Sequence, residues 1–86
     1  MNDDEARLVI QRMKSGGGWS RDSYASYSQT RYSYDADRGF VEWEQHGHTG
    51  EMTEVIRSEE QFLECLCRYF TFEDLTSRMG GLKRPP

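Results

Sequence analysis

The stretch from Ser23 to Arg57 reads SYASYSQTRYSYDADRGFVEWEQHGHTGEMTEVIR, and polar and apolar residues alternate along much of it. A period of two is typical of β-strands, because successive side chains point to opposite faces of a sheet. Turn residues interrupt the alternation at DADRGF, residues 35–40, and at HGHTGE, residues 46–51. We therefore predict three strands joined by two hairpins, which form a three-stranded antiparallel meander.

Turn chemistry also predicts the register. A type I turn followed by a left-handed glycine pairs Asp35 with Phe40, and a four-residue loop pairs His46 with Glu51. These pairings place one set of side chains on the face that we expect to be buried: Thr30, Tyr32, Tyr34, Val41, Trp43, Met52 and Ile56. The set expected on the opposite face comprises Arg31, Ser33, Phe40, Glu42, Glu44, His46, Thr53, Val55 and Arg57.

Helices are predicted before and after the strands in the sequence. Asn2 or Asp3 caps the first, which runs to about Lys14 before a run of three glycines. Its apolar residues recur at helical spacing: Ala6, Val9, Ile10 and Met13. Ser58 and Gln61 form a capping box, so a second helix begins at Glu59.

A short helical turn from Phe72 to about Met79, capped by Thr71, follows the second helix, and a frayed tail occupies residues 82–86. The fold class is α+β. We expect one domain over residues 1–86 with the order α-β-β-β-α, in which both helices pack on one face of the sheet and the other face stays open.

Composition narrows the class of partner. The chain of 86 residues carries 11 basic and 15 acidic residues, a formal net charge of −4. An acidic protein of this kind is a poor match for nucleic acid or an anionic membrane, so we expect a basic protein partner. The start, MNDDEARLVI, lacks the features of a signal peptide, and no segment reaches the ~20 apolar residues that span a membrane. We therefore predict a cytoplasmic location.

Histidines and cysteines raise the question of a metal or an active site. His46 and His48 with Cys65 and Cys67 make a set that zinc accepts. On a helix, however, residues two apart lie about 200° around the axis, so the two thiols cannot share one ion. We expect no metal and no cofactor. A small enzyme or ligand-binding domain that uses the histidines and neighbouring glutamates is kept as an alternative.

Aromatic and acidic residues indicate a protein-binding surface. Tyr24, Tyr27 and Phe40 have no place in the predicted core, and Trp19 is a further candidate of this kind. Exposed aromatics surrounded by polar residues are typical of interfaces. Acidic residues on the same open face would steer a basic partner: Glu42, Glu44 and Glu51. These six residues, without Trp19, are the predicted binding site.

The segment GFVEWEQHGHTGEMTEVIRS, followed by EEQFLECLCRYFTFEDL, resembles small acidic immunity proteins of bacterial polymorphic or contact-dependent toxin systems. The resemblance implies a non-enzymatic inhibitor that covers the active site of a toxin, commonly a basic nuclease. A third hypothesis is a homodimeric accessory subunit paired through the first strand, which would be an edge of a three-stranded meander.

Overall fold

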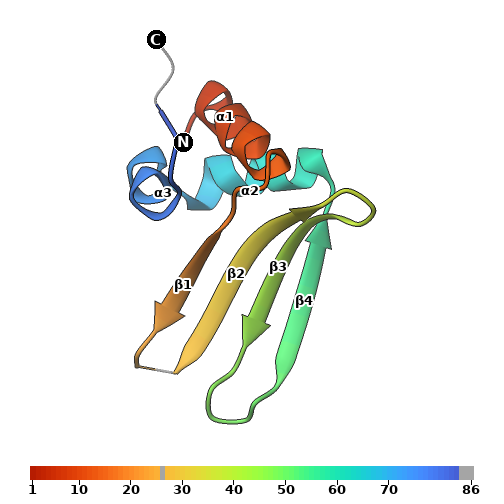
Figure 1. Cartoon of the computed structure of the whole chain (residues 1–86), viewed down its shortest axis with the longest axis vertical. Coiled ribbons are helices and arrows are strands. Elements are labelled where there is room, and N and C mark those ends of the chain that lie inside the picture. The colour runs from red at the N-terminus through yellow and green to blue at the C-terminus, as the bar shows by residue number, and fades with distance from the viewer. Residues whose placement is uncertain (26, 84–86) are drawn as a thin grey trace.

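The computed structural model describes residues 1–25 and 27–83 of the chain. Its elements follow in the order α1 (Asp3–Lys14), β1 (Trp19–Ser23), β2 (Ser28–Asp35), β3 (Gly39–Gln45), β4 (Met52–Arg57), α2 (Glu59–Tyr69) and α3 (Phe72–Arg78) (Figure 1). The strands form one antiparallel sheet of four, in the order β1-β2-β3-β4. The α+β class and the antiparallel meander are confirmed, but the predicted sheet lacked its first strand.

The additional strand β1 forms because its first residue belongs to the core. Trp19 pairs with Tyr32 of β2, and the two rings stack with their centroids 4.6 Å apart. Phe70 meets the Trp19 ring edge-on at 5.7 Å. Because β1 lies beside β2, the expectation that the strand leading into Asp35 is an edge is wrong, and the edge strands are β1 and β4.

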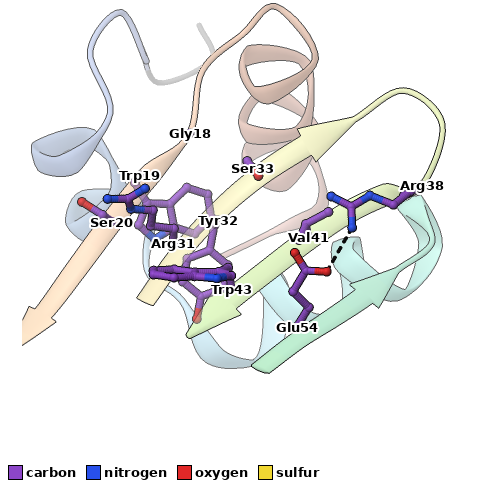
Figure 2. A pocket seen from close by; sticks show the side chains of 10 residues that line it. All are labelled: Gly18, Trp19, Ser20, Arg31, Tyr32, Ser33, Arg38, Val41, Trp43 and Glu54. Atoms are coloured by element: carbon purple, nitrogen blue, oxygen red, sulfur yellow. Dashed lines mark hydrogen bonds and ion pairs between the residues drawn. The ribbon is translucent and has the colours of Figure 1, made fainter. Parts of the chain in front are cut away.

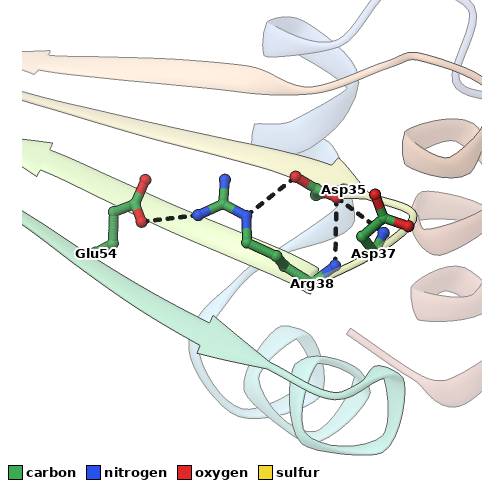
Figure 3. A network of polar contacts seen from close by, with 4 residues as sticks. All are labelled: Asp35, Asp37, Arg38 and Glu54. Atoms are coloured by element: carbon green, nitrogen blue, oxygen red, sulfur yellow. Dashed lines mark hydrogen bonds and ion pairs between the residues drawn. The ribbon is translucent and has the colours of Figure 1, made fainter.

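The first hairpin is one residue tighter than predicted. Asp35 pairs with Gly39, not with Phe40, so the loop has three residues. Gly39 has a φ of 111°, a backbone conformation that residues other than glycine rarely adopt. The Asp35 carboxylate accepts hydrogen bonds from the backbone N–H groups of Asp37 and Arg38, at 2.8 and 3.3 Å (Figure 3). These local bonds hold the tighter turn.

A one-residue change of register moves every side chain of the following strand to the other face. Phe40, Glu42 and Glu44 therefore share a face with Tyr32, and the prediction that they lie on the open face is wrong. The second hairpin is as predicted, since the His46 N–H donates to the Glu51 carbonyl at 2.8 Å. Four residues expected to be covered by the helices therefore lie on the open face: Val41, Trp43, Met52 and Ile56.

The predicted helix starts are confirmed. Asn2 and Glu5 form a capping box on α1, Ser58 and Gln61 form one on α2, and Thr71 caps α3. The core lies between the helices and one face of the sheet: Ala6, Val9, Ile10, Met13, Trp19, Tyr32, Phe40, Phe62, Leu66, Phe72, Leu75 and Met79. At its centre the Phe40 and Phe62 rings stack, with 4.7 Å between centroids.

The helices gather near one end of the sheet, and the turns at the far end extend past them (Figure 1). Of the predicted tail, Leu82 packs against the core, and residues 84–86 lie outside the described residues. Among the described residues, no helix combines the length and the apolar content that crossing a membrane requires.

Candidate functional site

The side of the sheet turned away from the helices, here called the open face, carries an apolar strip. We define the apolar strip as Val41 and Trp43 of β3 with Met52 and Ile56 of β4. Val41 pairs with Ile56, so the two strands contribute to one continuous surface. Met52 is 62% exposed and Ile56 is 46% exposed. Val41 is 5% exposed and Trp43 is half-buried, so Met52 and Ile56 are the two members of the strip that folding leaves exposed.

Arg31 lies over the indole ring of Trp43 on the same face. Its guanidinium carbon is 5.2 Å from the ring centroid, a distance at which cation and π-system attract each other. None of the ion pairs found in residues 1–25 and 27–83 includes Arg31. The stacking therefore holds a guanidinium in place while leaving its hydrogen-bond donors available to a second molecule.

A shallow hollow of about 670 Å³ lies beside this stacked pair (Figure 2). Arg31 and Trp43 form one side of it, and Val41 lies between them and the opposite side. On that side Arg38 binds Glu54, with 3.0 Å between Nη1 and Oε2. The hollow is wide and open to solvent, so it suits a protruding side chain better than an enclosed small molecule.

Tyr24 and Tyr27 of the predicted site lie in the turn between β1 and β2, where they are 87% and 68% exposed. The Tyr27 ring meets His48 edge-on, with 5.2 Å between centroids. The two turns at this end of the sheet are in close contact, because a Cβ added to Gly47 would lie 2.0 Å from the Tyr27 carbonyl oxygen. Both tyrosines therefore lie at the tip of the sheet, in the turn rather than on a strand.

Phe40 and the predicted acidic residues do not join that strip. Phe40 is 2% exposed, so it is part of the core and offers no surface to a partner. Glu42 pairs with Arg57 at 3.3 Å, on the side of the sheet that faces the helices. On the same side, Glu44 pairs with His46 Nε2 at 2.9 Å. Of the three predicted acidic residues, only Glu51, in the second hairpin loop, is exposed.

The Tyr32 ring lies in the core, and its hydroxyl lies beside Glu42 on the same helix-facing side of the sheet. Burial raises the pKa of its hydroxyl to about 12, and the neighbouring Glu42 carboxylate adds to the effect because a tyrosinate would be repelled by it. The hydroxyl is therefore held neutral and serves as a hydrogen-bond donor to Glu42. The Glu42 carboxylate is thus partnered on two sides, by Tyr32 and by Arg57.

Histidines and cysteines do not converge. His46 and Glu44 lie in an open depression with Thr30 and Arg21, whereas His48 contacts Tyr27 in the turn. The Cys67 thiol donates to Asp3 of α1, 3.4 Å away. Cys65 lies on the other side of α2, in a shallow depression with Arg57 of β4. Within the described part of the chain, no three His, Cys, Asp or Glu side chains are grouped as a metal site would require.

The thiols are also poorly suited to nucleophilic chemistry. Burial raises the pKa of the Cys65 thiol and, together with the neighbouring Asp3 carboxylate, that of the Cys67 thiol. A raised pKa reduces the fraction of reactive thiolate at neutral pH.

Sequence reasoning missed Arg31 and Trp43 as surface partners because it assigned Trp43 to the core. A local signal could have found them. The sequence DADRG fits a three-residue hairpin loop, residues 36–38, followed by a glycine that can adopt a positive φ. That loop length places Trp43 beside Arg31 on the open face. The chain matches no protein-family model, no curated protein and no solved structure.

Proposed function

We propose that this domain is a non-enzymatic protein-binding module that contacts its partner through the open face, with Trp43 as the central anchor. The observation that carries the proposal is the half-buried Trp43 with Arg31 stacked on its ring, beside the exposed Met52 and Ile56 on the same face. Tryptophan and arginine are the residue types in which binding energy at protein interfaces concentrates. Met52 and Ile56 stay exposed after folding, so packing within the domain does not explain them.

The surroundings of the apolar strip support the same function. Polar groups border it, among them Ser20, Ser33 and the Arg38–Glu54 pair. An apolar centre with a polar rim is the usual composition of a protein interface. The available donors of Arg31 favour a partner that places a carboxylate beside an apolar side chain. We propose this chemistry in preference to the basic partner expected from the net charge and the predicted acidic face, because Glu42 and Glu44 lie on the other side of the sheet.

A capture experiment with matched variants tests the proposal. The tagged wild-type domain and the variants Trp43→Ala, Arg31→Ala and Tyr69→Ala are incubated separately with extract of the source cells. Tyr69 is an exposed aromatic of α2, outside the open face, and serves as the control. We expect one protein to be retained by the wild type and by Tyr69→Ala. Trp43→Ala should bind it about 30-fold more weakly, as for an anchor worth ~2 kcal/mol.

Circular dichroism must first show that every variant is folded. A partner that binds the Trp43→Ala and Arg31→Ala variants as tightly as the wild type would contradict the proposal, because the interface would then lie elsewhere. Inhibition of a bacterial toxin is one activity that such a face would perform by covering an active site, and only the sequence resemblance supports it. Co-expression with the product of a neighbouring toxin gene, with Trp43→Ala as the negative control, tests that role.

A further inference from the structure

The two edge strands of the sheet differ in how they are protected. β1 exposes polar residues along its length after the buried Trp19. β4, in contrast, has Met52 and Ile56 on the open face and Val55, 43% exposed, on the opposite face. An exposed edge with apolar side chains on both faces is a template for another strand. Figure 1 shows no element of the described chain along the outer side of β4.

The backbone of β4 is oriented for such pairing. The hydrogen bond from the His46 N–H to the Glu51 carbonyl fixes which residues of the hairpin face each other. Because the direction of the backbone groups alternates along an antiparallel ladder, Met52, Glu54 and Ile56 direct their N–H and C=O groups away from β3. The free edge therefore offers donors and acceptors at the spacing that a second antiparallel strand requires.

We propose that two copies of this chain associate through their β4 strands, which pair antiparallel about a twofold axis at Glu54. In this register Met52 lies opposite Ile56 of the second copy on the open face. Thr53 lies opposite Val55 of the second copy on the other face. Apolar and β-branched residues directly opposite each other stabilise antiparallel pairs, so the strand is complementary to itself.

Charge also favours this register. At each end of the paired strands Glu51 lies opposite Arg57 of the second copy, so opposite charges meet. The two Glu54 carboxylates approach each other at the axis, and each is bound by Arg38 of its own chain at 3.0 Å (Figure 3). The same guanidinium binds Asp35, also at 3.0 Å, which fixes its position. Each carboxylate at the axis thus has its own counter-charge, and their mutual repulsion is reduced.

An axis at Val55 fits less well. That register would place Glu51 opposite Glu59 of the second copy, where like charges repel. It would also bring Ser58 into the ladder, although the Ser58 N–H is already bound to the Gln61 side chain at 2.9 Å in the capping box of α2. The axis at Glu54 avoids both conflicts.

The association has a geometric consequence. A twofold axis at an antiparallel edge is perpendicular to the sheet, so four strands from each copy form one sheet with all helices on one side. Both apolar strips then face the same direction, and a partner with two binding sites would be held at both. The self-association itself does not depend on what the open face binds.

Sedimentation equilibrium over a range of concentrations up to about 1 mM, where even weak pairs associate, tests the proposal. We expect the apparent mass of the wild type to rise from 10.1 kDa toward twice that value. Val55→Lys, which places an ammonium group on the pairing edge, should keep the protein monomeric. Asp22→Lys, a charge change on the other edge strand, should leave association unchanged.

A second pair of variants tests the charges at the axis. Arg38→Met leaves the two carboxylates without counter-charges and should weaken association by about tenfold or more. The double variant Arg38→Met, Glu54→Gln removes the repulsion and should restore it. A monomeric wild type at every concentration would overturn the proposal, and so would a dimer that Val55→Lys leaves intact. Neither outcome would affect the capture experiment on Trp43.

Discussion

Replacement of Phe40 by alanine separates the observed register from the predicted one. In the structure the Phe40 ring is buried, stacks on Phe62 at 4.7 Å with 8° between the planes, and contacts Tyr34 with 5.0 Å between centroids. Phe40→Ala therefore leaves a cavity in the centre of the core. In the register that turn chemistry predicted, the same ring would lie on the open face, and its removal would have little effect on stability.

The expected loss follows from the burial. Removing a buried phenylalanine side chain costs about 3 to 5 kcal/mol, which includes its packing against neighbouring rings. A domain of 86 residues has a free energy of unfolding of roughly 4 to 13 kcal/mol. Phe40→Ala should therefore remove between about a quarter and all of the stability. With an m-value of about 1 to 1.5 kcal/mol/M for a domain of this size, the urea midpoint should fall by roughly 3 M.

Urea unfolding followed by far-UV circular dichroism measures this loss, and Tyr24→Ala is the matched control. Tyr24 is an aromatic residue with almost its whole side chain in water, so its replacement should change the free energy of unfolding by about 0.5 kcal/mol or less. If Phe40→Ala were as stable as Tyr24→Ala, the Phe40 ring could not be in the core, and the observed register of β2 with β3 would be refuted.

Three further outcomes follow from single contacts. Because burial holds Tyr32 neutral with a pKa of about 12 against 10.0 in the unfolded chain, the contribution of Tyr32 to stability should be constant below pH 10 and fall by up to about 3 kcal/mol toward pH 12. The pH dependence of urea unfolding should lose this component in Tyr32→Phe. Gly47→Ala should lower the thermal midpoint clearly through its clash with Tyr27, whereas Gly80→Ala, with open space around the added carbon, should not. Ser58→Ala removes the N-cap of α2 and should cost about 1 kcal/mol in urea unfolding.

The helices could be predicted from the sequence because their starts depend on neighbouring residues. A capping side chain bonds a backbone group three residues away, so Ser58 and Gln61 carry the whole signal within four positions. β1 carries no such signal. Its sequence, WSRDS, has one apolar residue, and its place in the sheet depends on Trp19 packing against Tyr32 and Phe70, which come later in the chain.

The register of the first hairpin was ambiguous for a different reason. β3 has apolar residues on both of its faces, since Phe40 points to one face and Val41 and Trp43 point to the other. Either face of the strand could therefore have served as the core face, and the length of one loop decided between them. The candidate site could not be predicted before that choice was made, because the same choice determines whether Trp43 or Phe40 lies on the open face.

The second apolar face of β3 is itself the strongest reason to assign a binding role to the open face. A sheet covered by helices on one side needs apolar residues on that side only, and solvated faces of such sheets are usually polar. Phe40 satisfies this need in β3. Trp43, Met52 and Ile56 add apolar area on the side that the helices leave uncovered, where it gives the isolated domain no core and makes association with itself or with others more favourable. A second molecule that covers this area gives these residues the burial that the fold does not.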